Sequence, residues 1–278
     1  MSISFGSQFY YPEGGAGHSQ LRFQEVKSQK HIDLLFIGSS HAYRNYDPRI
    51  FNQEQKAAFN LGSTAQTPIQ TWEILQHLPH HLLPKRLIID FYLPLFYNEG
   101  IESSIDLLAN TDFYPMRWSE HHDVKWYNAL LYRTLSKKLL NLQPKKNPKR
   151  IGHDQYITGG YVQSHQAFDA RHQTPKVSGI INQSQVNALQ NIVLWANDRK
   201  IKWMIVQSPI FSSHEAAKYE NLPLALQEII PTEKFINGQS AVPLALKNFI
   251  DSDHLSTAGV QDYNSWLMDT LKKKHFFD

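Results

Sequence analysis

Two short motifs near opposite ends of the chain carry the residue types that nucleophilic chemistry requires. Ser40 lies in Gly38-Ser39-Ser40-His41, directly after the apolar run 34–37, whereas Asp251 and His254 lie close to the C-terminus. A serine hydroxyl is a weak nucleophile at neutral pH and needs an adjacent base. Imidazole titrates near neutrality, and a carboxylate on its second nitrogen orients it and stabilises its charged form. The two motifs therefore predict acyl transfer through a serine ester, with Ser40 as nucleophile, His254 as base and Asp251 as the orienting carboxylate.

The tetrahedral intermediate of such a reaction also needs hydrogen-bond donors for its oxyanion. The backbone N–H groups of Ser40 and Gly62 are the candidates, because both residues follow strand ends on one edge of the predicted sheet. One donor of this kind typically contributes roughly 10²–10³-fold to the rate. Three further side chains near this edge are candidate substrate contacts, and for the first two a packing role is the alternative: His41, Tyr92 and Gln207.

The elements that must position these residues are short apolar runs, each ended by glycine or polar residues. They lie at 33–37, 57–60, 86–91 and 202–207, with a weaker run at 233–236. The runs are largely apolar rather than alternating, which is typical of parallel strands covered on both faces. Helical patterns separate them, at 67–75, at 182–199 and after Ser256. Alternating strands and helices predict a three-layer α/β fold with a parallel sheet.

One long region, at about 98–180, interrupts the alternation. It contains a helical pattern near 124–135 and then a basic, proline-containing stretch at 143–150. We interpret it as a helical and loop insertion over the carboxyl edge of the sheet, a candidate lid or substrate-binding subdomain. The whole chain, 1–278, is then a single α/β domain that carries this insertion.

Composition narrows the classes of protein that fit. The chain has 278 residues, 41% of them hydrophobic, and a net charge of +3, which does not indicate a nucleic-acid partner. The absence of cysteine excludes disulfides, a thiolate nucleophile and thiolate metal sites. No apolar run approaches the ~18 residues of a membrane span, and the first residues lack a signal-peptide pattern. The sequence as written predicts a cytoplasmic protein, or a periplasmic or extracellular one if it is an excised domain, and leaves the oligomeric state open.

Three sequence blocks resemble the SGNH/GDSL hydrolases, a superfamily of esterases, lipases and carbohydrate O-acetyl-esterases or transferases. The blocks are Ile37-Gly38-Ser39-Ser40, Asn60-Leu61-Gly62 and Asp251-Ser252-Asp253-His254-Leu255, and the resemblance covers about 32–96 and 200–272. It implies a flavodoxin-like, five-stranded sheet in the order 2-1-3-4-5 and a site without a cofactor or metal. The branch it resembles most is associated with acylation of polysaccharides, which implies an acylated carbohydrate or small molecule as substrate.

The chain departs from the family at two places. Ser39 stands where the family often has Asp, and the third block reads Ile89-Asp90-Phe91-Tyr92-Leu93-Pro94, without the family's oxyanion-donating Asn. An ionised Asp90 cannot donate a hydrogen bond, whereas the Tyr92 hydroxyl could. The missing donor leaves a second hypothesis, a non-catalytic carbohydrate-binding or assembly module on a degenerate esterase fold.

Two histidine clusters suggest a third hypothesis, a metal-dependent hydrolase. His77, His80 and His81 form one cluster, and His121-His122-Asp123 forms the other. Histidines at helical spacing can bind zinc, but Pro79 interrupts the first cluster, so surface histidines are the favoured interpretation and no metal is expected. Arg44 could hold an anionic substrate, although a salt bridge is the favoured interpretation.

Overall fold

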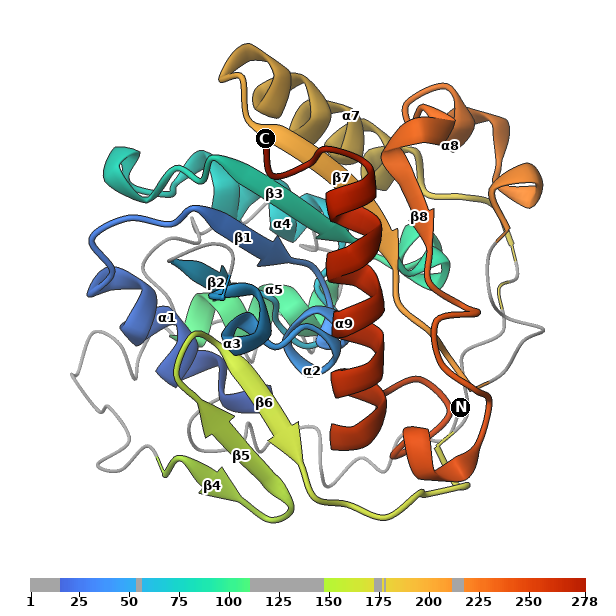
Figure 1. Cartoon of the computed structure of the whole chain (residues 1–278). Coiled ribbons are helices and arrows are strands. Elements are labelled where there is room, and N and C mark those ends of the chain that lie inside the picture. Colours follow the sequence, from blue (N-terminus) through green and yellow to red (C-terminus); the bar gives the residue numbers. More distant parts are fainter. Residues whose placement is uncertain (1–15, 54–56, 111–147, 173–176, 178, 212–217) are drawn as a thin grey trace.

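A parallel sheet between two layers of helices forms the centre of the computed structural model (Figure 1). The structure describes residues 16–53, 57–110, 148–172, 177, 179–211 and 218–278. The sheet has the order β2-β1-β3-β7-β8, and each neighbouring pair is parallel. Its strands are β1 (Leu34–Ile37), β2 (Ala58–Asn60), β3 (Arg86–Asp90), β7 (Lys202–Gln207) and β8 (Phe235–Asn237). This confirms the predicted three-layer α/β fold and the order 2-1-3-4-5.

Successive residues of each strand point into opposite layers, so both faces of the sheet are buried. In β1, Leu35 and Ile37 pack into one core, whereas Leu34 and Phe36 pack into the other. The first core is covered by α1 (Ser19–Lys27), α4 (Pro68–Gln76), α5 (Ile101–Asn110), α7 (Gln183–Asp198) and α8 (Leu224–Gln227). The second is covered by α2 (Ser40–Asn45), α3 (Pro48–Phe51) and α9 (Thr257–Lys273). Figure 1 shows α9 in front of the sheet, with α4 and α5 behind it.

The weak fifth strand exists, but it begins later than predicted. Pro231 is followed by a 3₁₀ turn at Thr232–Lys234, so the extended backbone starts at Phe235. Phe235 pairs with Ile205 and Ile236 with Val206, which places β8 at the edge of the sheet.

The region 98–180 contains a small antiparallel sheet that the interpretation as a helical and loop insertion missed. Besides α5, its described residues form β4 (Arg150–Ile151), β5 (Asp154–Ile157) and β6 (Tyr161–Ser164). These strands are too short for a periodic pattern, and their turn needs the positive φ angles of Gly159 and Gly160, +97° and +92°. The helical pattern predicted near 124–135 lies outside the described residues. No helix in the described ranges is long and apolar enough to cross a membrane.

Candidate active site

Ser40 is the first residue of α2, three residues beyond the carboxyl end of β1. The turn between them depends on Gly38, whose φ is +146° and where an added Cβ would lie 2.7 Å from the Asp90 Cβ. Ser39 caps the helix, because its Oγ accepts a hydrogen bond from the N–H of His41 at 3.2 Å. The strand, the tight turn and the cap together present the Ser40 hydroxyl at the carboxyl edge of the sheet.

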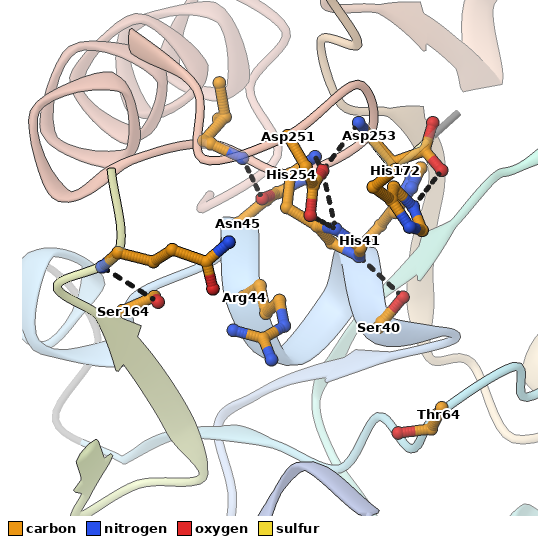
Figure 2. A network of polar contacts seen from close by, with 12 residues as sticks. Ser40, His41, Arg44, Asn45, Thr64, Ser164, His172, Asp251, Asp253 and His254 are labelled. Carbon is orange, nitrogen blue, oxygen red and sulfur yellow. Dashed lines mark hydrogen bonds and ion pairs between the residues drawn. The ribbon is translucent and has the colours of Figure 1, made fainter. Parts of the chain in front are cut away.

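The structure brings Ser40, His254 and Asp251 together (Figure 2). His254 lies in the loop before α9, and its Nε2 is 2.8 Å from the Ser40 Oγ. Its Nδ1 is 3.0 Å from both carboxylate oxygens of Asp251. Asp251 accepts the Nδ1 hydrogen, so Nε2 is the nitrogen that can accept the hydrogen of the Ser40 hydroxyl.

The Asp251 carboxylate also organises its own loop. Its Oδ1 accepts the backbone N–H groups of Asp253 and His254, each at 2.8 Å. Burial alone would raise the pKa of Asp251, but its hydrogen bond and electrostatic interaction with His254 outweigh burial and hold that pKa well below its usual range. Asp251 therefore remains ionised, as an orienting carboxylate must.

Asn45, which was not predicted, joins α2 to the loop that carries Asp251 and His254 by hydrogen bonds. Its Oδ1 accepts the Leu255 N–H at 3.1 Å, and its Nδ2 donates to the Ser208 Oγ at 2.9 Å. The Asn45 carbonyl accepts a bond from Asn264 of α9 at 2.6 Å. One buried amide side chain thus fixes α2 against the end of β7 and the start of α9.

His41 packs against His254, and Tyr92 packs against His41. The His41 ring lies 4.2 Å from that of Tyr92 and 5.2 Å from that of His254, measured between centroids. Burial lowers the pKa of His41 to about 3, and its electrostatic interaction with His254 acts in the same direction, so His41 is neutral. The sequence left substrate contact and packing open for both residues. In the structure the ring of each packs against a neighbouring ring.

The second predicted oxyanion donor, Gly62, is already engaged. Its N–H donates to the Asn60 Oδ1 at 3.1 Å, whereas the Asn60 Nδ2 donates to the carbonyls of Ala42 and Tyr46, at 2.5 and 3.1 Å. Gly62 nevertheless packs directly on the nucleophile turn, since an added Cβ would lie 2.9 Å from the Ser39 carbonyl oxygen. An oxyanion could use the Gly62 N–H only by sharing it with Asn60.

Gln207 is buried at the end of β7. Its Nε2 donates to the Asn237 Oδ1 at 3.5 Å, which turns the amide towards β8, on the far side of β7 from β3 and β1.

A buried carboxyl that sequence reasoning treated only as an unsuitable donor lies beneath the nucleophile turn. Asp90 ends β3, and its two oxygens accept bonds from the hydroxyls of Ser39 and Tyr46, at 3.0 and 3.3 Å. Burial raises the pKa of Asp90 to about 7, although these hydrogen bonds oppose the change.

Arg44, and His77 of the first histidine cluster, have structural partners. The Arg44 guanidinium forms a two-point ion pair with Asp154 of β5, at 3.0 and 2.6 Å, as the favoured interpretation expected. His77 bonds through Nδ1 to the Glu73 carbonyl at 2.8 Å. The second cluster, at 121–123, lies outside the described residues.

Within the described part of the chain, one group of side chains has the composition and spacing of a metal site. It comprises His172, Asp251 and His254, whose ligand atoms lie within 4.8 Å of one another. Two of these three already form the hydrogen-bonded pair beside Ser40. His172 was not predicted, because nothing in its sequence neighbourhood connects it with the C-terminal motif.

Comparison with known proteins adds little beyond this geometry. No protein-family model matches the sequence, and no curated protein does. A solved structure from Streptococcus pneumonia, provisionally described as a platelet activating factor, is 15% identical over 91% of each chain, with a TM-score of 0.44. Another, provisionally described as an acylhydrolase from Bacteroides fragilis, is 14% identical over 92% of this chain and 97% of its own, with a TM-score of 0.32. Similarity at this level does not assign a function.

Proposed function

We propose that this protein is a serine esterase or O-acyltransferase that acts through an acyl-enzyme intermediate. The observation that carries the proposal is the continuous hydrogen-bonded series from Ser40 Oγ through both ring nitrogens of His254 to the Asp251 carboxylate, with distances of 2.8 and 3.0 Å. A nucleophile, a base within reach of it and a group that orients the base are the parts that this chemistry needs.

In the proposed reaction the Ser40 Oγ attacks an ester carbonyl while His254 Nε2 takes the hydroxyl proton. The imidazolium, stabilised by Asp251, then gives that proton to the alcohol oxygen as its bond to the acyl carbon breaks. Water, or the hydroxyl of a second molecule, attacks the acyl-Ser40 ester by the same steps in reverse order. The first acceptor gives hydrolysis and the second gives transfer.

The Ser40 N–H supports stabilisation of the oxyanion. As the first N–H of α2 it has no acceptor within the helix, and none is found for it among the described residues. In the proposed mechanism Gly62 supplies a second donor when the developing negative charge on the oxyanion competes with the neutral Asn60 amide for its N–H.

The substrate class that we propose is an O-acetylated carbohydrate, and this part rests on resemblance to SGNH/GDSL hydrolases. The nucleophile block, the Asn60-Leu61-Gly62 block and the Asp251-to-His254 block occur in the order of that superfamily. The missing third-block Asn is the main departure from it.

Hydrolysis of p-nitrophenyl acetate by the wild type and by Ser40→Ala tests the acyl chemistry. Circular dichroism of both proteins establishes that they are folded. Activity lost only in the variant supports the proposal, whereas equal rates would remove Ser40 as nucleophile. Release of acetate from acetylated glycans then tests the substrate class.

A second candidate is a non-catalytic carbohydrate-binding or assembly module. The engagement of the Gly62 N–H by Asn60 favours it, because it leaves one backbone donor ready for an oxyanion. This candidate predicts that wild type and Ser40→Ala bind an acetylated glycan equally and that neither releases acetate.

A further inference from the structure

A third imidazole, that of His172, lies against the exposed side of the proposed base. The ring centroids of His172 and His254 are 5.9 Å apart, and 47% of the His172 side chain is exposed, against 11% for His254. Figure 2 shows the His172 imidazole beside that of His254, with Ser40 below the pair. Since the buried His41 also packs on His254, the half-exposed His172 marks a side from which a ligand can reach the base.

Asp253 fixes the orientation of His172. Its Oδ2 is 3.0 Å from the His172 Nε2, and its side chain is only 5% exposed. The carboxylate accepts the Nε2 hydrogen and raises the pKa of His172 above its usual value. Nδ1 is therefore the nitrogen that His172 offers to a ligand; within the described structure no protein group occupies it.

The segment 168–172, which carries His172, contacts the loop that carries His254. The Asp169 N–H donates to the Ile250 carbonyl at 2.7 Å, and Phe168 packs on Phe211 with ring centroids 5.0 Å apart. The Phe211 N–H in turn donates to the Ser252 carbonyl at 2.9 Å. His172 thus keeps its place beside His254 without a ligand, as a preorganised binding residue should.

The proposed reaction determines which part of the substrate lies beside His172. The base gives its proton to the alcohol oxygen during acylation and takes a proton from the acceptor during deacylation. Hence the alcohol portion of the ester, not the acyl portion, lies against the exposed side of His254.

We propose that His172, positioned by Asp253, binds a free hydroxyl group of that alcohol, next to the oxygen that leaves. The inference rests on the proposed function and narrows its substrates to esters of polyols. An alcohol with one hydroxyl group would leave His172 Nδ1 without a partner.

Two acetate esters that differ by one hydroxyl group test the proposal. The quantity measured is the ratio of kcat/KM for 2-hydroxyethyl acetate to that for ethyl acetate. His172→Ala should lower this ratio about tenfold, the usual effect of one hydrogen bond. Asp253→Asn should lower it in the same direction, because His172 loses its carboxylate. His165→Ala, an exposed histidine of the same segment, is the matched control and should keep the wild-type ratio.

A wild-type ratio in His172→Ala would overturn the role of His172, and this includes the case in which kcat/KM falls equally for both esters. Covalent labelling of Ser40 with a fluorophosphonate separates this result from failure of the proposed function. If wild-type Ser40 is not labelled, the serine mechanism fails and the role of His172 with it. If Ser40 is labelled and the ratio does not change, only the role of His172 is wrong.

Discussion

The Ser39 hydroxyl donates a 3.0 Å hydrogen bond to the Oδ2 of Asp90, which joins the nucleophile turn to the end of β3. The Tyr46 hydroxyl donates to the other oxygen of Asp90 at 3.3 Å and accepts a bond from the Tyr263 hydroxyl, also at 3.3 Å. A buried polar chain therefore runs from α9 to the residue that caps α2. Because the cap sets the first turn of that helix, Asp90 contributes to the position of Ser40.

Replacing Asp90 with Asn should remove a pH dependence of stability. Burial raises the pKa of Asp90 from 3.8 to about 7, so its contribution to stability is fully present below about pH 4 and is lost as the pH rises to about 7. The neutral amide of Asp90→Asn has no such loss. The free energy of unfolding of the variant, relative to wild type, should increase by roughly 3–4 kcal/mol between pH 4 and pH 8. Urea denaturation at the two pH values measures it, and a pH-independent difference would show that folding does not raise the pKa of Asp90.

Replacing His41 with Phe should keep the packing against Tyr92 and remove a buried nitrogen. The pKa of His41 is lowered from 6.5 to about 3, so wild-type stability is lost as the pH falls through that range. His41→Phe should therefore become progressively more stable than wild type below about pH 6, which thermal denaturation at pH 4 and pH 8 measures. The acid limb of the kcat/KM profile should not move, because a neutral His41 does not titrate there. A displaced limb would instead assign His41 to the reaction.

Replacing Asp251 with Asn should lower kcat by about 10⁴-fold, as incorrect histidine tautomers do. The Asn side chain can present an N–H to His254 Nδ1, which would place the imidazole hydrogen on Nε2 and prevent that atom from accepting the Ser40 proton. Its Oδ1 can still accept the backbone N–H groups of Asp253 and His254, so the loop should remain folded. The measurement is kcat with p-nitrophenyl acetate, with circular dichroism as the control for folding. Normal turnover would move the orienting role to Asp253.

The features of the fold and site that could be predicted from the sequence are those that a short stretch of residues specifies by itself. The runs 34–37 and 203–206 are apolar along their whole length, which marks buried parallel strands, and a capping box and proline mark the start of α4. Ser40, Asp251 and His254 could be selected because their residue types and positions at predicted element boundaries limit the chemistry available to them.

The parts that could not be predicted depend on packing between distant segments. His172 meets Asp253 across 81 residues of sequence, and Asn45 meets Leu255 across 210. Neither pair has a pattern in its own neighbourhood. The hydrogen bond from Gly62 to Asn60 is local, but its geometry depends on how the turn folds beneath α2.

Replacing Gly62 with Ala should lower kcat more than replacing Gly152 with Ala. The added Cβ would lie 2.7 Å from the Ala42 Cβ and 2.9 Å from the Ser39 carbonyl oxygen, so the first turn of α2 must move. We expect a loss of about 1–3 kcal/mol in the free energy of unfolding and a lower kcat, because Ser40 moves with that turn. Gly152→Ala is the control, since its φ of +59° strains alanine but no atom lies within 4 Å of the added Cβ. Urea denaturation and kcat are measured for both variants. Normal turnover in a destabilised Gly62→Ala would show that Ser40 keeps its position without the close approach of residue 62.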